Sequence, residues 1–274
     1  MYNAITGRIA RSIGDYEKAA GLDSMWREPV VRFAATETMD LAWLKQAVSS
    51  DHLLPADILP DAKSVICFFV PFHKSVVQSN AAPGPASAEW ALAYIKTNEL
   101  IAVINRDIEA LLEKNGYRAG KIPATHNFDE TTLISRWSHR HIAYLAGLGT
   151  FGMNNMLITE KGCCGRIGTM VTNYRYAGHD GAAITAVPEK CLNKINGSCG
   201  LCRKKCEAGA YPADAPGSFD RRACYAKCLE NAELHKSLGL ADVCGKCVAG
   251  LPCSLSEPRF ISTSPRFSPT SPFA

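Results

Sequence analysis

The sequence predicts a mixed α/β (α+β) chain in which a large domain is followed by a small cysteine-rich domain. An apolar run at 64–72 has the length and composition of a buried strand, and residues 88–114 carry apolar side chains at helical spacing. Nine of the twelve cysteines fall between Cys191 and Cys253. A length of 274 residues suits one large and one small domain. The expected divisions are an α/β domain, a cysteine-rich domain and a Ser/Pro-rich tail: 1–185, 186–258 and 259–274.

Each element of the large domain has a local signal. The run at 64–71 is rich in β-forming residues and ends at a proline, which is typical of a buried strand. The long amphipathic helix at 88–114 is stopped by Asn115-Gly116. We also expect a short helix at 41–49, a helix at 134–145 closed by Gly147, and two strands, 155–160 and 167–173, that pair across the turn between them.

The composition excludes several classes of protein. The chain is 47% hydrophobic and 20% charged with a net charge of +4, which does not fit a disordered, collagen-like or long coiled-coil protein. No apolar run reaches the roughly 18 residues of a membrane helix. The N-terminal residues lack the apolar segment of a secretory signal. We therefore expect a cytoplasmic protein that does not associate with membranes.

The clustered cysteines indicate metal binding. A reducing cytoplasm disfavours structural disulfides, so thiolates at short spacing are better explained as metal ligands. Two thiolates of a C-x2-C arm reach one metal centre, and a cysteine three or four residues further on can bind a neighbouring centre. Structural zinc sites are the alternative, because C-x2-C pairs also form zinc ribbons. Eight cysteines have the spacing of two four-thiolate sites: Cys191, Cys199, Cys202, Cys206, Cys224, Cys244, Cys247 and Cys253.

The segment after Cys206 favours iron–sulfur clusters over zinc. Its sequence, Cys-Glu-Ala-Gly-Ala-Tyr-Pro, resembles the Cys-Pro-Thr-Gly-Ala-Ile stretch of bacterial ferredoxins, with Glu207 and Tyr211 as departures. Cys228 is either a substitute ligand for Cys224 or a buried thiol on the same helix face. The ferredoxin resemblance implies interleaved ligation of two 4Fe-4S clusters, by Cys191, Cys199, Cys202 and Cys253 on one and by Cys206, Cys224, Cys244 and Cys247 on the other.

A glycine-rich segment is the second distinctive feature. Gly147, Gly149 and Gly152 form Gly-x-Gly-x-x-Gly, but the segment follows a predicted helix and precedes a predicted strand. This order is the reverse of that in dinucleotide-binding folds, so that function is rejected. We expect a tight turn whose backbone a ligand can approach.

The glycine segment also carries a family resemblance. Its sequence, Ala-Gly-Leu-Gly-Thr-Phe-Gly-Met-Asn-Asn at 146–155, resembles the Ala-Gly-Leu-Gly-Trp-Ile-Gly-Lys-Asn signature of epoxyqueuosine reductases. Residues 157–168 and the Asp-Arg-Arg-Ala-Cys element at 220–224 also match, and the resemblance covers about residues 60–255. Reductive dehalogenases share this architecture. The resemblance implies a nitroreductase-like domain that binds cobalamin, followed by a ferredoxin-like domain with two 4Fe-4S clusters.

The implied cofactors are two 4Fe-4S clusters and a base-off cobalamin, and a flavin fits the same fold. The expected cofactor-binding residues are those of the glycine segment: Gly147, Leu148, Gly149, Thr150, Phe151, Gly152 and Asn154.

The proton donor departs from the family pattern. Epoxyqueuosine reductases place a catalytic Asp upstream of the glycine segment, where this chain has Leu133. The candidates here are Asp129, His139 and His141. The two histidines are two residues apart on a predicted helix, so we expect them to face different directions. A histidine that titrates near neutral pH is a suitable proton source for a reductase.

The resulting hypothesis is a cobalamin-dependent iron–sulfur oxidoreductase that acts on an unidentified small, non-tRNA substrate and receives electrons from reduced ferredoxin or flavodoxin. One alternative is a corrinoid-binding electron-transfer protein that reduces or stores cobalamin for a partner. Another is an epoxyqueuosine reductase with a rearranged proton donor. Nucleic acid is not favoured as a partner, because the basic run at 203–205 is short, lacks interleaved aromatic residues and compensates cluster charge.

Overall fold

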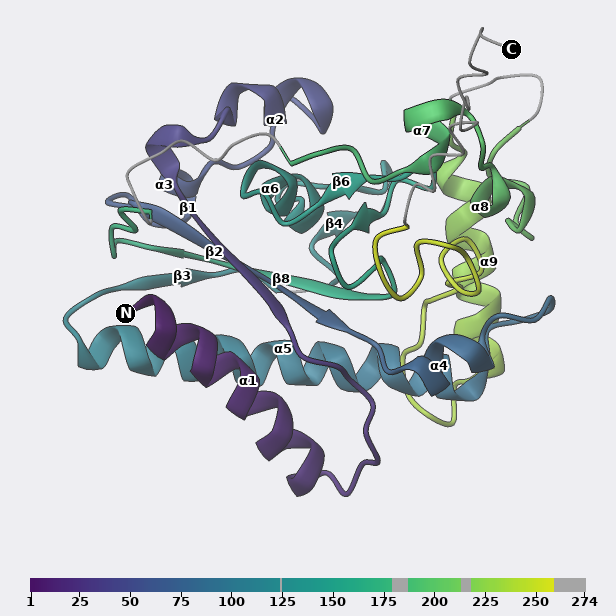
Figure 1. Ribbon diagram of the computed structural model, residues 1–274, viewed down its shortest axis with the longest axis horizontal. Helices are drawn as coiled ribbons and strands as arrows, with labels where there is room; N and C mark the ends of the chain where they lie inside the picture. Colours follow the sequence, from purple (N-terminus) through teal and green to yellow (C-terminus); the bar gives the residue numbers. More distant parts are fainter. Residues whose placement is uncertain (124, 179–186, 213–217, 259–274) are drawn as a thin grey trace, which may run out of the picture.

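The computed structural model describes residues 1–123, 125–178, 187–212 and 218–258. Its centre is a four-stranded sheet in the order β1 (Val30–Ala35), β2 (Ser64–Pro71), β8 (Gly165–Thr172), β3 (Ala119–Lys121), with every neighbouring pair antiparallel. Helices cover both faces (Figure 1). The mixed α/β (α+β) architecture predicted from the sequence is confirmed.

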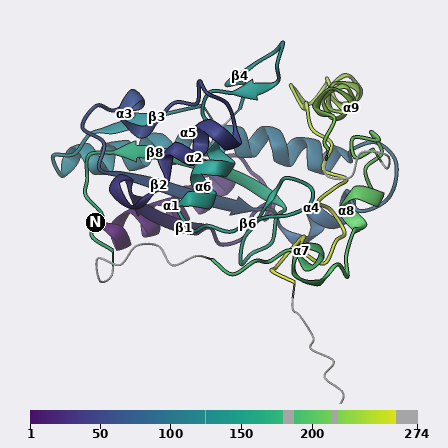
Figure 2. The same cartoon turned by 90° about the horizontal axis from the view of Figure 1, so that it is seen from above.

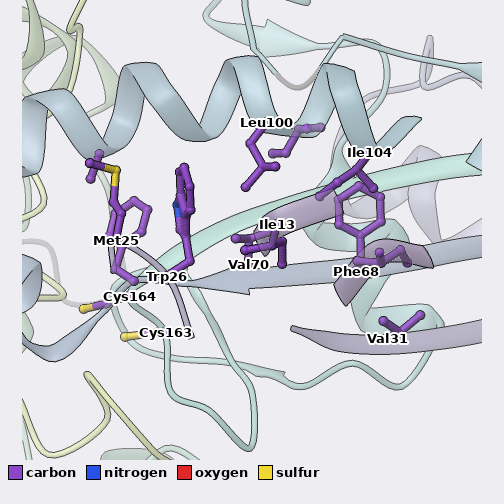
Figure 3. Packing of buried hydrophobic residues seen from close by; sticks show 14 of the residues in the cluster. Ile13, Met25, Trp26, Val31, Phe68, Val70, Leu100, Ile104, Cys163 and Cys164 are labelled. Atoms are coloured by element: carbon purple, nitrogen blue, oxygen red, sulfur yellow. The ribbon is translucent and has the colours of Figure 1, made fainter. Parts of the chain in front are cut away.

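The two helical layers follow from the alternation along β2. Its eight residues are all buried, because successive side chains point to opposite faces of the sheet and both faces are covered. Ile66, Phe68 and Val70 pack in one core cluster with α1 (Tyr2–Ala19) and α5 (Ala88–Lys114), as Figure 3 shows for several of these side chains. Val65, Cys67 and Phe69 belong to the opposite cluster, with α2 (Leu41–Ala47) and α6 (His139–Leu145).

Three predicted elements are confirmed. β2 and α5 have the predicted ends, and α2 ends two residues before the predicted limit. The Ser87 side chain caps α5 by accepting a hydrogen bond from the Trp90 N–H. Gly116, with φ +79°, ends the helix in a conformation that glycine adopts without a steric penalty. The sequence signals missed α1, β1 and β3.

The helix predicted at 134–145 begins too early. Ile134–Ser135 is instead strand β5, which pairs with β4 (Phe128–Asp129). Leu133 has φ +56° and so lies in the left-handed region, which interrupts a right-handed helix. The helix α6 begins at His139, and Trp137 is buried against the sheet with its indole N–H bonded to Thr169 Oγ1 at 2.9 Å.

The pairing predicted between 155–160 and 167–173 is also wrong. β7 (Leu157–Ile158) pairs with β6 (Thr150–Phe151), whereas β8 lies between β2 and β3 in the central sheet. The residues between β7 and β8 form a local turn, in which Thr159 N–H donates to Gly162 O at 3.0 Å. The predicted linker lies partly, and the predicted tail wholly, outside the described residues.

The cysteine-rich segment contains α7 (Leu192–Asn196), α8 (Leu201–Lys204) and α9 (Arg221–Leu234). All three lie at the end of the molecule away from the N-terminus in Figure 1 and Figure 2, the end at which α4 (Lys74–Ser79) also lies. Remaining short elements are the 3-10 turn Thr36–Thr38 and α3 (Pro55–Ile58). None of the helices in the described ranges is long and apolar enough to cross a membrane. The division into domains at about residue 185 stays a prediction.

Candidate metal centre and adjoining cavity

The structure gathers the eight candidate ligands into two groups of four. Cys191, Cys199, Cys202 and Cys253, called here the first thiol set, line one small cavity of about 20 Å³. The pKa of Cys202 is raised to about 11, mainly by burial and to a smaller extent by Cys253, Cys191 and Cys199, since closely spaced thiolates repel one another. The four sulfurs therefore lie within electrostatic reach of one another although they are spread over residues 191–253.

The second thiol set consists of Cys206, Cys224, Cys244 and Cys247. All four line a cavity of about 430 Å³, called here the thiol cavity. Burial raises the pKa of Cys247, and the nearby Cys224, Cys244 and Cys206 add to that rise. The grouping by cavity matches the two ligand sets that the ferredoxin resemblance implies.

A fifth thiol lies at the second set. Cys228 is one helical turn after Cys224 on α9 and lines the same cavity. The Cys228 thiol donates a hydrogen bond that lowers the pKa of Cys224, and the charge of Arg140 lowers it as well. Cys228 thus lies next to Cys224, the candidate ligand for which it is the substitute.

Cys163 and Cys164 join the β7–β8 turn to the cysteine-rich segment. The N–H groups of both residues donate to the backbone of that segment, at 2.9 Å to Cys253 O and 3.1 Å to Ser254 O. Cys163 Sγ lies 3.9 Å from Cys253 Sγ and donates to it, while Cys164 Sγ donates to Val248 O at 3.1 Å. Both lie at the end of the main core in Figure 3. No local sequence signal links Cys163 to Cys253, because the two residues are 90 positions apart.

Further contacts fix the cysteine-rich segment against the large domain. Asn154 Nδ2 donates to Cys247 O at 2.7 Å, and Asn80 Nδ2 donates to Cys244 O at 2.9 Å. Lys205, in the basic run that is predicted to compensate cluster charge, donates to the carbonyl oxygens of Ala81 and Ala249 at 2.9 and 3.0 Å. These bonds hold the C-x2-C arm in position from both sides.

The donor chemistry of both sets fits iron–sulfur clusters. Soft thiolates are the ligands that such clusters and zinc prefer. Within the described ranges no three or more His, Cys, Asp or Glu side chains converge on a point where a single metal ion would bind. In a 4Fe-4S cluster each of the four thiolates binds a different iron, so the thiolates enclose a volume and do not meet at one point. Each thiol set here lines a cavity.

His139, predicted as a proton donor, is built into the core. It is 9% exposed, and its Nε2 lies 2.9 Å from Pro123 O, so Nε2 carries the proton. Nδ1 accepts from the Thr169 hydroxyl at 2.8 Å. Burial lowers the His139 pKa to about 4, with the charge of Arg166 contributing. A neutral imidazole with both nitrogens engaged holds the helix on the sheet.

His141 and Asp129 lie elsewhere. His141 faces a third cavity of about 700 Å³, the mouth cavity, where its ring lies 4.8 Å from that of Phe151. Burial, with a smaller effect of Arg140, lowers its pKa to about 4. The two histidines thus face different directions, as their spacing predicts. Asp129 is exposed and accepts from Thr132 N–H at 2.7 Å, which lowers its pKa.

The glycine segment is held mainly by internal packing. A methyl group on Gly149 would lie 2.2 Å from Ile158 O, so this glycine permits close contact of β6 with β7. Gly147 has φ +73° at the end of α6, and Leu148 is only 2% exposed in the core. The Thr150 hydroxyl donates to Glu189 Oε1 at 3.0 Å. These four predicted cofactor-binding residues do not line the three cavities described here.

The second half of the segment does reach the cavities. Phe151 lines the mouth cavity, and Gly152 lines the small cavity of the first thiol set. Asn154 lines both thiol-set cavities, and the adjacent Asn155 lines the thiol cavity and the mouth cavity. Within the glycine segment, the residues that line these three cavities therefore lie at 151–155.

A polar group that sequence reasoning missed lines the thiol cavity. The hydroxyl of Tyr94, on α5, donates to Asp242 Oδ1 at 2.7 Å and lies 3.1 Å from Thr125 Oγ1. The Arg166 guanidinium lies 4.3 Å from the centroid of the Tyr94 ring. Burial raises the Tyr94 pKa, an effect that Arg166 opposes. His126 Nε2 lies 3.3 Å from Asp242 Oδ2. These residues come from four separate stretches, so no local motif marks them.

Comparisons with known proteins identify the fold. No family model and no curated protein matches the chain. Among solved structures, the catabolic reductive dehalogenase NpRdhA matches at a TM-score of 0.55 and 14% identity, over 84% of this chain and 30% of that one. An epoxyqueuosine reductase with a tRNA stem loop matches at 0.49 and 18%, over 93% and 68%. The Streptococcus thermophilus epoxyqueuosine reductase matches at 0.48 and 16%, over 90% and 68%. The solved neighbours are thus the two groups that the sequence resembles, and the chain has the fold of the matching part of the reductive dehalogenase.

Proposed function

We propose that this chain is a cytoplasmic iron–sulfur oxidoreductase that holds two 4Fe-4S clusters and a cobalamin and reduces a small molecule in the thiol cavity. The observation that carries the proposal is the separation of eight cysteines into two sets of four, with the second set opening into a cavity of about 430 Å³. A ligand cavity of that size is typical of small-molecule sites. The first set is then the entry site for electrons and the second set the delivery site.

The adjoining cavities support a large cofactor. The thiol cavity and the mouth cavity share Arg140, Asn155, Phe219 and Arg221, so together they form a continuous lining. Apolar side chains such as Trp90 and Phe72 would contact the flat face of a corrin ring, and Arg140 and Asn155 would hold its polar rim. Cobalamin would supply a low-potential cobalt next to the second thiol set. A flavin is the alternative occupant.

Tyr94 is the side chain that we assign as proton donor. Its raised pKa keeps the phenol protonated at neutral pH, and the Arg166 guanidinium would stabilise the phenolate after transfer. Asp242 holds the hydroxyl and connects it to His126, whose side chain is 41% exposed. This series of contacts provides a path by which solvent returns the proton. Such a group favours an enzyme over a protein that only stores cobalamin.

The test is anaerobic reconstitution followed by titration with cobalamin. We expect the broad visible absorption of thiolate-bound iron, and a base-off cobalamin spectrum on addition of the cofactor. Spectra that add as independent components, or flavin released from the purified protein, would contradict cobalamin binding. With a substrate found by screening, Tyr94→Phe should slow turnover about 100-fold or more at unchanged iron content. Tyr144→Phe, at an exposed tyrosine, is the matched control.

A further inference from the structure

The exposed surface beside the first thiol set has a distinctive composition. Ile195 on α7 and Leu201 on α8 are each 44% exposed, which is unusual for large aliphatic side chains. Leu201 precedes Cys202, and the Ile195 N–H donates to Cys191 O at 3.0 Å. The two helices lie next to each other in both Figure 1 and Figure 2. Each of these two exposed side chains therefore lies next to, or one helical turn from, a cysteine of the first thiol set.

Net positive charge lies next to this apolar pair. Between residues 187 and 207 the chain has five basic residues and two acidic residues, Glu189 and Glu207. Lys194 lies 3.9 Å from Glu189 and Lys190 pairs with Glu257, so the net positive charge comes from the basic run at 203–205. Lys194 and Lys204 are exposed, and Arg203 lies over the Tyr211 ring at 5.6 Å from its centroid. Exposed aliphatic side chains next to a net positive charge are typical of a transient protein interface, in which charge steers the encounter.

A second exposed apolar patch provides a comparison. Leu229, Leu234, Leu238 and Leu240 are 39–60% exposed at the end of α9. The charges around them cancel, because Lys227 pairs with Glu230 and Lys236 with Glu233. That patch therefore offers apolar contact without electrostatic attraction for a charged partner.

We propose that the surface formed by Lys194, Ile195, Leu201, Arg203 and Lys204, called here the docking surface, binds an acidic one-electron carrier protein. The inference rests on the proposed function, because it requires a cluster on the first thiol set. The reduced carrier loses one electron, and the cluster bound by Cys202 and its partners gains it, with no proton or bond change. The carrier then leaves, which agrees with the small size of the apolar centre.

The experiment uses the anaerobically reconstituted chain and a reduced acidic flavodoxin as the carrier. Stopped-flow absorbance follows reduction of the clusters at several ionic strengths, and calorimetry measures binding of the oxidised flavodoxin. Lys204→Glu and Leu201→Ser test the docking surface. Lys236→Glu and Leu240→Ser, called here the α9 variants, make the same chemical changes just after the end of α9. Dithionite, a small reductant that does not need a docking site, reports on the clusters themselves.

We expect Lys204→Glu to slow reduction by flavodoxin about tenfold at low salt, and the difference to shrink as salt screens the charges. Leu201→Ser should weaken calorimetric binding, while both α9 variants and all dithionite rates stay at the wild-type value. Intact clusters with equal flavodoxin rates in all variants, or slowing only by the α9 variants, would overturn the docking surface and leave the proposed function standing. A chain that takes up no clusters would be recognised by its spectrum before mixing, and it would overturn both.

Discussion

Replacing Gly149 by alanine distinguishes a structural from a cofactor-binding role for the glycine segment. The added methyl would lie 2.2 Å from Ile158 O and 2.8 Å from Ile158 C. Both are backbone atoms, so relief requires β6 and β7 to separate rather than a side chain to rotate. Leu148 and Leu157, at 2% and 3% exposure, would lose core packing as the strands move.

The expected cost follows from this overlap. Overpacking a well-packed site typically costs 1–3 kcal/mol, and a backbone obstacle places Gly149→Ala at about 3 kcal/mol. For a domain of this size that corresponds to a fall in Tm of roughly 10 °C. Differential scanning calorimetry of the chain without added cofactor measures the effect. Gly14→Ala is the control, because this exposed glycine in α1 has no atom within 4 Å of the added methyl.

Gly14→Ala should stabilise the chain by about 0.5–1 kcal/mol through the higher helix propensity of alanine. If Gly149→Ala unfolds like the wild type and only weakens cofactor binding, the assignment of this glycine to internal packing is refuted.

Three other outcomes follow from the contacts. Arg27→Met removes hydrogen bonds of 2.8 Å to three backbone carbonyl oxygens, one of them just after Cys253, so it should cost about 3 kcal/mol in urea unfolding and release iron from the first thiol set. Cys163→Ala removes the thiol that donates to Cys253 and should lower the reduction potential of one cluster in an EPR-monitored titration, whereas Cys67→Ala should not. His139 has a folded pKa of about 4 and an unfolded value near 6.5, so the unfolded chain binds the extra proton as pH falls. The unfolding free energy should be highest above about pH 6.5, and the contribution of His139 should fall by about 3 kcal/mol towards pH 4. His139→Gln should remove this contribution and leave that of His141, whose pKa is also lowered to about 4.

Local sequence signals were sufficient where one element carries its own information. The apolar run of β2 and the helical period of α5 specify buried elements whatever surrounds them, and both are confirmed. The start of α6 was missed because residues 134–135 pair with β4 and because the Trp137 indole is buried and bonded to Thr169, 32 residues away. β7 was assigned the wrong partner because its neighbour, β6, is only two residues long.

The candidate site likewise has parts that the sequence predicts and parts that only the folded chain brings together. Cysteine spacing predicted two sites of four thiolates, and the ferredoxin resemblance implied the members of each. The members of each implied set line one cavity, and Cys163 and Cys228 also line the cavity of the second set. Tyr94 and Asp242 lie 148 residues apart, and Cys163 and Cys253 lie 90 apart, so only the folded chain brings each pair together. The proton donors chosen from the sequence were selected by residue type. Residue type does not reveal that the nitrogens of His139 are already engaged.

Iron and acid-labile sulfide analysis of oxygen-free protein tests the two-cluster assignment most directly. We expect about eight irons and as many sulfides per chain, as two 4Fe-4S clusters require. Cys202→Ser combined with Cys253→Ser should leave about four irons, and Cys67→Ser should leave all eight or so in place. Zinc in place of iron, or fewer than about six irons in the wild-type chain, would contradict it.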